Sequence, residues 1–97
     1  MLNKVLHHPI RTQIIALLYV KDAIAFKVLK KELELSDGAI ATHIKALDKE
    51  GYIKIHKFFE ENKPKTEYSI TPKGKDDFYQ YITQLKGFIN DVEPPQN

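Results

Sequence analysis

The sequence predicts a single α+β domain in the order helix, short strand, helix, helix, β-hairpin, helix. Two observations predict this order. Apolar residues recur at three- and four-residue spacings up to residue 50 and again from residue 72, and they alternate with polar residues between these positions. A length of 97 residues with 42% hydrophobic side chains suffices for one modest core. We therefore expect one domain over residues 1–90 and a disordered tail over 91–97.

The composition excludes several classes of function. The chain has no cysteine, which excludes thiol redox sensing, cysteine zinc sites and cysteine nucleophiles, and fits a reducing cytosol. No apolar run approaches the roughly 20 residues of a membrane span, and the N-terminus lacks a secretory signal, so we expect a soluble, cytoplasmic protein without a membrane partner. The net charge of +2, with a mildly basic middle of the chain, permits nucleic-acid binding but does not demand it.

The first helix is expected from about Pro9 to Tyr19. A proline suits the first turn of a helix, and the residues after it form an apolar stripe of Ile10, Ile14, Leu17 and Leu18. Residues 1–7 carry apolar side chains at helical spacing and should form a short turn or helix that packs on another element. His7 and His8 are adjacent, so they cannot share one helical face as two metal ligands would, and we expect structural or capping roles for them.

A short strand and a second helix are expected next. Residues 20–26 alternate weakly, which predicts a brief strand around Ile24. Residues 26–35 predict a helix of about two turns that ends just before Ser36. Its lysines would reach phosphates or be solvated, and the sequence favours neither; they are Lys27, Lys30 and Lys31. A short helix followed closely by a capped one is typical of a helix-turn-helix motif, although many helical domains contain such a pair.

The third helix, over residues 36–50, has two distinct faces. Ser36 and Asp37 are good N-caps, and Gly51 lies where a C-terminal stop is expected. The buried face is predicted by the spacing of Ile40, Ile44 and Leu47. The opposite face is small and polar at first and basic toward its end, and consists of Gly38, Ala41, Thr42, Lys45 and Lys49. Small residues let a helix lie deep in a DNA groove, but taken alone this helix is better interpreted as an ordinary amphipathic helix.

A β-hairpin and a last helix complete the predicted fold. Residues 52–58 and 65–71 alternate between apolar and polar side chains, as half-buried strands do. The polar segment 59–64 between them ends in a proline, as a hairpin tip would. Thr71 and Pro72 then predict the N-cap and the first residue of a helix.

This order is the winged helix-turn-helix arrangement, and the segment from Asp37 to Lys75 resembles small winged-helix DNA-binding domains related to MarR- and ArsR-type transcriptional regulators. The matching residues are Asp37-Gly38, Thr42-His43, Leu47, Gly51-Tyr52, Lys57, Lys63-Pro64, Thr66, Thr71-Pro72 and Gly74. The opening helix is similar to that of the same group at His8-Pro9-Ile10-Arg11, Ile14 and Leu17-Leu18. The resemblance covers roughly residues 5–90.

The resemblance implies sequence-specific binding of double-stranded DNA by a transcriptional regulator. It implies no enzymatic activity, no cofactor and no metal. The recognition helix over 36–50 would lie in the major groove, and the hairpin over 52–71, the wing, would lie on the backbone or in the minor groove. The expected DNA-binding residues are Ser36, Asp37, Gly38, Ala41, Thr42, Lys45, Lys57, Lys63, Pro64 and Lys65.

The residue types at this site predict modest direct reading of bases. The outer face of the recognition helix has no Arg, Asn or Gln, the side chains best suited to bidentate base contacts, so affinity should come largely from phosphate contacts and symmetry. Phosphate would repel Asp37, which suits capping or a cytosine amine better, and His43, at the edge of the buried face, is expected to be structural. The wing carries lysines beside Glu60 and Glu61 instead of the arginines that enter narrow minor grooves, which favours backbone contact.

The last helix, over about 72–90, is expected to carry a homodimer interface. Its apolar stripe is longer than the core of one small domain needs, and apolar residues near the N-terminus add to it. The expected interface residues are Leu2, Val5, Leu6, Phe78, Tyr81, Ile82, Leu85, Phe88 and Ile89. Two recognition helices one DNA turn apart would read a palindromic operator.

Three alternatives follow from the same residues. A winged-helix module would bind protein instead of DNA, with its basic face solvated. An enzyme is disfavoured, because the sequence has no phosphate loop and no carboxylate–histidine group at a suitable spacing. Metal sensing is disfavoured by four scattered histidines and no thiols, although a site shared across a dimer stays open. The sequence gives no operator, no effector ligand and no direction of regulation.

Overall fold

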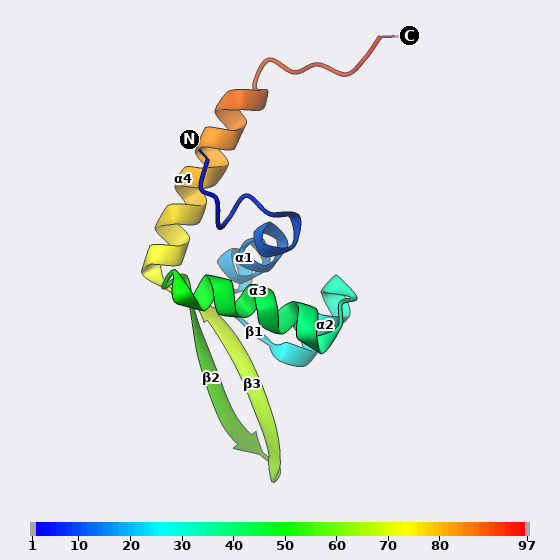
Figure 1. Ribbon diagram of the computed structural model, residues 1–97, viewed down its shortest axis with the longest axis vertical. Coiled ribbons are helices and arrows are strands. Elements are labelled where there is room, and N and C mark those ends of the chain that lie inside the picture. The colour runs from blue at the N-terminus through cyan, green and yellow to red at the C-terminus, as the bar shows by residue number, and fades with distance from the viewer. Residues whose placement is uncertain (1, 97) are drawn as a thin grey trace.

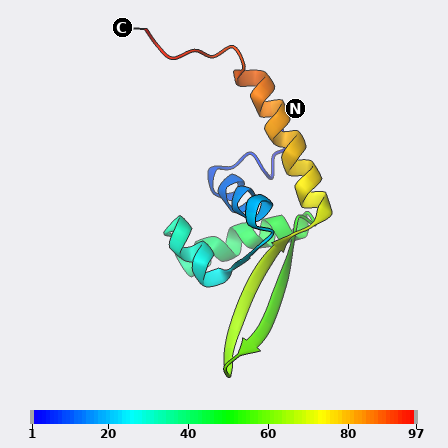
Figure 2. The ribbon, with the colours of Figure 1, turned by 180° about the vertical axis from the view of Figure 1, so that it is seen from behind.

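The computed structural model describes residues 2–96 and has the α+β element order that the sequence predicts. The helices are α1 (Pro9–Lys21), α2 (Phe26–Leu33), α3 (Asp37–Lys49) and α4 (Pro72–Ile89), and the strands are β1 (Ala23–Ala25), β2 (Ile53–Glu60) and β3 (Lys63–Ile70). The strands form one antiparallel sheet in the order β1-β3-β2. Helices α1 to α3 form the body of the molecule, from which the β2–β3 hairpin and α4 project in opposite directions (Figure 1, Figure 2).

Helix α1 is closed by specific groups at both ends. The N-cap is His8, whose ring Nδ1 accepts a hydrogen bond from the amide of Ile10 (3.1 Å), so the capping role expected for this histidine is confirmed. The helix continues past its predicted end at Tyr19. It stops where Asp22 adopts a positive φ of 66° and its amide donates to the carbonyl of Leu18 (2.7 Å).

The N-terminal segment forms a turn that covers the core. The side-chain carbonyl of Asn3 accepts hydrogen bonds from the amides of Val5 and Leu6 (2.9 and 3.0 Å), which holds the turn closed. The carbonyl of Leu6 in turn accepts a hydrogen bond from the hydroxyl of Thr12 in α1. Leu6 is fully buried as a result.

One hydrophobic core joins the N-terminal turn, helices α1 to α3, the base of the sheet and the first half of α4. The inward residues predicted for the recognition helix are confirmed, because Ile40, Ile44 and Leu47 are all buried. The complete buried cluster is Leu6, Ile14, Ile15, Leu18, Ile24, Leu29, Ile40, Ile44, Leu47, Tyr52, Ile53, Tyr68, Phe78 and Tyr81. Burial of each large side chain contributes about 1.5–3 kcal/mol to stability.

The hairpin is longer and its turn tighter than predicted. The strand ladder runs out to the pair of Glu60 and Lys63, so the loop expected over 59–64 is mostly strand. The turn consists of Glu61 and Asn62, which both have positive φ (52° and 63°), the backbone of a two-residue hairpin turn. The sequence pattern did not predict strand here, because the segment is polar and contains a proline.

Helix α4 begins as predicted and ends at Ile89. The hydroxyl oxygen of the N-cap Thr71 accepts a hydrogen bond from the amide of Gly74 (2.9 Å), and Pro72 is the first helical residue. Residues 92–96 are exposed and form neither helix nor strand, while Met1 and Asn97, the ends of the predicted domain and tail, lie outside the described residues. Over residues 2–96, none of the helices has the length and apolar character needed to cross a membrane.

Candidate nucleic-acid interface

Helix α3 presents outward the face that the sequence indicated. The N-cap is Ser36, whose hydroxyl oxygen accepts a hydrogen bond from the amide of Ala39 (3.2 Å). The space beside Gly38 is open, so the helix surface there is flat. The hydroxyl of Thr42 donates to the carbonyl of Gly38 (3.0 Å). The outward residues are all exposed, namely Gly38, Ala41, Thr42, Lys45 and Lys49.

Asp37 takes a different part from its neighbour Ser36. It is the first residue of α3, and its carboxylate forms an ion pair with Lys30 of α2. An acidic side chain in the first turn also interacts favourably with the positive end of the helix dipole. The pair ties α2 to α3 at a partly exposed position, so Lys30 contacts a protein carboxylate here.

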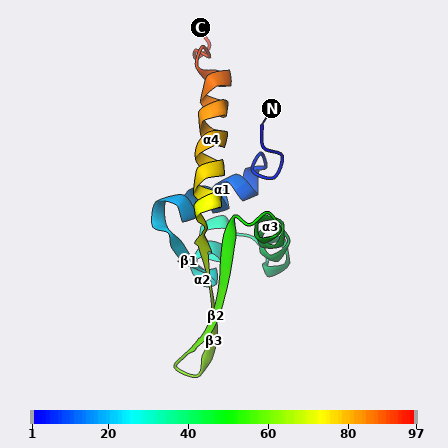
Figure 3. The ribbon, with the colours of Figure 1, turned by 90° about the vertical axis from the view of Figure 1, so that its left-hand side faces the viewer.

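A groove separates the outward face of α3 from the base of the wing. Its volume is about 360 Å³, and Figure 3 shows α3 end-on beside the hairpin. Ala41 and Lys45 line its helical side, and Lys57 and Thr66 line its wing side. Residues 41, 45 and 57 of the predicted DNA-binding set therefore share one surface, although they come from two elements.

The other predicted wing residues lie around a second hollow, of about 310 Å³, between the outer hairpin and the start of α2. Pro64 and Lys65 line it together with Lys27. The charge of Lys65 is the main reason that the pKa of Lys27 is lowered, with a smaller effect from Lys63. Three ammonium groups are thus gathered at this end of the molecule. The place of Lys27 beside the wing follows from the pairing of β1 with β3, which the weak pattern over 20–26 could not define.

The histidine of α3 packs against the N-cap of α1. The ring centroids of His43 and His8 are 4.6 Å apart, and both side chains are half-buried. Burial lowers the pKa of His43, and the positive charges of His8 and Arg11 lower it further. This packing fits the structural role that the sequence indicated for His43.

The C-terminal end of α3 is locked to the start of α4. Gly51 ends the helix with a φ of 78°, as its predicted role as a stop requires, and its carbonyl accepts a hydrogen bond from the hydroxyl of Thr71 (2.6 Å). The amide of Thr71 donates to the carbonyl of Tyr52 (2.9 Å). Gly74 packs so closely on the same carbonyl that a Cβ would lie 2.3 Å from its oxygen. The orientation of α3 is therefore fixed relative to α4.

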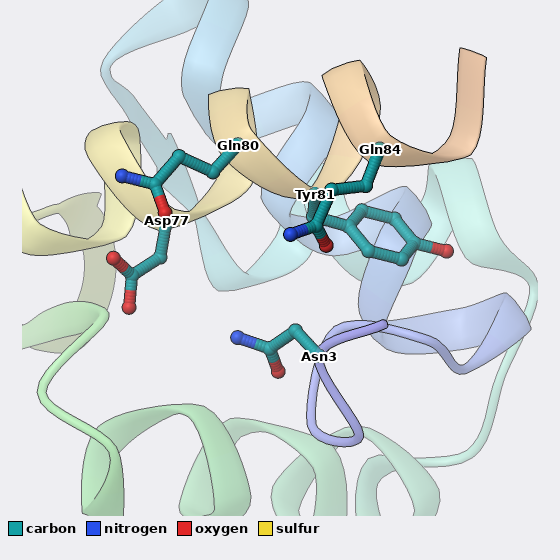
Figure 4. A pocket seen from close by; sticks show the side chains of 5 residues that line it. All are labelled: Asn3, Asp77, Gln80, Tyr81 and Gln84. Carbon is teal, nitrogen blue, oxygen red and sulfur yellow. The ribbon is translucent and has the colours of Figure 1, made fainter. Parts of the chain in front are cut away.

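A tyrosine beside a polar hollow adds the N-terminal segment to this junction. The hydroxyl of Tyr52 donates to the carboxylate of Asp77 in α4 (2.9 Å) and accepts from the side-chain amide of Asn3 (2.8 Å). Burial is the main reason that the pKa of Tyr52 is raised. The hollow, of about 250 Å³, opens between this segment and α4 and is lined by Asn3, Asp77, Gln80, Tyr81 and Gln84 (Figure 4).

Part of the predicted dimer interface belongs to the core of the single chain. Leu6, Phe78 and Tyr81 are 0%, 7% and 3% exposed, so assigning them to an interface was wrong. Leu6 is part of the N-terminal turn, and Phe78 packs against Tyr19 of α1 with ring centroids 5.6 Å apart. The hydroxyl of Tyr81 lies 2.8 Å from the ring Nδ1 of His7 in the N-terminal segment. The residues of the predicted set that keep accessible surface are Leu2, Val5, Ile82, Leu85, Phe88 and Ile89.

Within residues 2–96, no three His, Asp or Glu side chains lie close enough together to hold a metal ion.

Comparisons with known proteins place this fold. Residues 10–89 match the family described as winged helix DNA-binding domain. The chain is 32% identical over 90 residues to the uncharacterized protein MJ0432 of Methanocaldococcus jannaschii, a match that covers 93% of this chain and 98% of that one.

Solved structures of similar shape include several transcriptional regulators. The transcriptional regulator homologue protein from Pyrococcus horikoshii OT3 is similar with a TM-score of 0.86 and 27% identity, over 93% of this chain and 89% of that one. The reduced form of the transcriptional regulator YodB from B. subtilis has a TM-score of 0.76 and 18% identity, over 96% of this chain and 89% of that one. The structure of overoxidized AbfR bound to DNA has a TM-score of 0.73 and 14% identity, over 84% of this chain and 59% of that one.

The matched family is one of DNA-binding domains, and two of these neighbours are a transcriptional regulator and a homologue of one, and not enzymes. The match covers every helix and strand of the fold apart from Pro9 at the start of α1, and it leaves out the N-terminal segment and the tail. This chain belongs to the family of winged helix DNA-binding domains.

Proposed function

We propose that the chain binds double-stranded DNA sequence-specifically as a homodimeric transcriptional regulator, with α3 in the major groove and the wing on the adjacent backbone or minor groove. One observation carries this proposal: the outward face of α3 and one face of the wing line a single groove with Lys45 and Lys57 on opposite sides. A DNA strand that runs between a major and a minor groove presents its phosphates to such a groove.

The residues of α3 suit shallow reading of base edges. The open surface at Gly38 lets the helix approach the floor of the major groove. The methyl group of Ala41 suits contact with a thymine methyl, and Thr42 suits either that methyl or a base edge. The free amides at the start of α3 favour a phosphate. Base contacts of this kind are few, so phosphate contacts carry most of the affinity.

The homodimer is supported by the outer half of α4. Its apolar stripe continues beyond the core, where Phe88 and Ile89 are 68% and 52% exposed in the single chain. Leu85 continues the same stripe toward the half-buried Leu2 and Val5. A two-fold pair formed through α4 would place two α3 helices on successive major grooves, about 34 Å apart, and would favour a palindromic operator.

The proposal is tested by fluorescence anisotropy with duplexes selected from genomic fragments, titrated over a range of salt concentrations. Affinity should fall steeply with salt, because each phosphate contact releases counterions. Lys45→Ala and Lys57→Ala should each reduce the slope by about one for each subunit of the dimer, whereas Lys86→Ala, on the distant part of α4, should not change it. Binding without salt dependence, or none at low salt, would contradict DNA binding and favour a protein-binding module.

A further inference from the structure

The outer wing carries an apolar rung that the fold does not use. Phe59 of β2 is 78% exposed, which makes it the most exposed aromatic side chain of residues 2–96. It lies directly opposite Pro64 of β3, which is exposed as well. Neither side chain belongs to the hydrophobic core or packs against its rim. The two side chains together form a small apolar patch at the end of a projecting hairpin, where it is free to contact another molecule.

The rung lies on the face of the wing that looks toward the α3 groove. Successive residues of a strand point to opposite faces, so the pairs that share a face alternate along the ladder. The pair of Lys57 and Thr66 lines the groove, and the pair of Phe59 and Pro64 is the next pair outward on that same face. Two residues of strand advance the surface by about 7 Å. If the phosphates of one DNA strand occupy the α3 groove, this rung therefore contacts the part of the duplex just beyond that strand.

The charges around the rung select the kind of molecule. Lys63 and Lys65 flank Pro64 in the sequence, and Lys27 stands beside Lys65. By the same alternation, Lys63 and Lys65 lie on the opposite face of the hairpin from the rung. Repulsion from Lys65 lowers the pKa of Lys27, as expected for two ammonium groups held close together. A bound polyanion would relieve this repulsion. A hairpin with an apolar rung on one face and lysines on the other fits a groove of DNA, whose two edges are phosphates and whose stacked base steps can receive an apolar side chain. Pro64 also lies beyond the end of β1, on an edge where it blocks addition of a partner strand.

We propose that Phe59 and Pro64 form an apolar wedge that enters the minor groove beside the α3 site and partly opens one base step, so that bound DNA is bent. This inference rests on the proposed function, which supplies the duplex in the α3 groove. Apolar wedges of Phe and Pro act in this way in minor-groove proteins, where unstacking a step costs a few kcal/mol and bends the duplex toward more protein surface.

The wedge accounts for specificity on a surface poor in base-reading side chains. Pyrimidine–purine steps such as TA open most easily, so a wedge discriminates sequences through the cost of deformation instead of through hydrogen bonds. The lysines of the wing alone would lead to backbone contact. The apolar rung adds a reason for the wing to enter the groove, while Glu60 lies on the opposite face of the hairpin.

The test uses the full chain and 30-base-pair duplexes recovered by selection, with 2-aminopurine placed in turn at each step flanking the α3 site and dyes at both ends. Bound wild-type protein should raise 2-aminopurine fluorescence at one step in each half-site and shorten the end-to-end distance. Phe59→Ala should abolish both signals and weaken binding about tenfold, as loss of a stacking aromatic does, with an unchanged salt slope. Lys63→Ala should instead lower the slope by about one for each subunit and keep the fluorescence signal.

Tyr79→Ala is the matched control, because Tyr79 is another exposed aromatic (64%) and lies on α4, away from the wing. It should leave affinity, bend and fluorescence unchanged. Salt-dependent binding by the wild type with equal affinity and equal bend in Phe59→Ala overturns the wedge alone. A straight duplex with no fluorescence change at any step overturns it too. No salt-dependent binding by the wild type overturns both the wedge and the proposed function.

Discussion

At the scale of single residues, two glycines of the junction carry the geometry that holds the recognition helix. Gly51 adopts a backbone conformation that side chains disfavour, and Gly74 lies against the carbonyl of Tyr52 with no room for a methyl group. Both were visible in the sequence as a helix stop and as part of a resemblance. The reason for Gly74 is a contact between segments more than twenty residues apart, which no local pattern encodes.

Gly74→Ala should destabilise the fold by about 1–3 kcal/mol, because the added Cβ would lie 2.3 Å from a backbone oxygen that cannot easily move. Urea unfolding followed by circular dichroism measures the change. Gly87→Ala is the control, since Gly87 is in the same helix with open space around it, and it should stabilise the protein by up to about 1 kcal/mol. Equal stability of Gly74→Ala and wild type would show that α4 does not pack this closely on the carbonyl of Tyr52.

Stability should fall as the pH drops below the ordinary His43 pKa of 6.5, because the folded state holds this pKa lower than the unfolded state does. In that range the unfolded chain binds more protons, so protonation favours unfolding. His43→Gln should flatten the decrease in melting temperature between about pH 6.5 and 5, whereas His56→Gln, at an exposed histidine of the wing, should leave it in place. An unchanged pH profile in His43→Gln would remove His43 as the cause.

At the scale of elements, the sequence predicted what periodicity and caps determine. The order of elements, the inward face of α3, and the caps Ser36 and Thr71 are all confirmed. The extent of the wing was not predictable in the same way. A polar segment that contains a proline forms a strand only on a free sheet edge, and only if the residues of its turn adopt positive φ, and neither condition is visible in the sequence pattern. The interface residues were misassigned for a related reason, since periodicity shows that a helix has an apolar face but not what covers it.

Tyr52→Phe should loosen the attachment of α3 to α4. The substitution removes the hydrogen bonds to Asp77 and Asn3, which should cost about 1–2 kcal/mol of unfolding free energy. Denaturant unfolding of this variant beside Tyr19→Phe, a partly exposed tyrosine, provides the comparison. Similar losses in the two variants would argue that the Tyr52 hydroxyl does not join these elements.

At the scale of the whole molecule, the chain is extended, 57 Å in its longest dimension, with the wing and α4 at opposite ends. The proposed DNA surface and the proposed dimer surface are therefore separate, and the α3–α4 junction links them. In this arrangement the spacing of two recognition helices depends on how two α4 helices pack, so dimer geometry would determine the spacing of operator half-sites.

Leu85→Glu should convert a dimer to a monomer without unfolding it, because the residue lies at the rim of the core on the exposed continuation of the α4 stripe. Sedimentation of the variant and the wild type at micromolar concentration, with circular dichroism as the check on folding, measures the effect. DNA affinity should fall with the loss of the second half-site. A wild-type chain that sediments as a monomer at these concentrations would contradict the homodimer.

The most direct test of the DNA surface is a titration of the isotope-labelled 97-residue chain with a selected duplex, followed by backbone amide chemical shifts. Binding through the proposed surface predicts that the largest shifts fall on the first half of α3, around Gly38 to Lys45, and on the wing from Lys57 to Lys65, with small shifts in α1. Shifts concentrated on α1 or α4, with α3 and the wing unchanged, would contradict it.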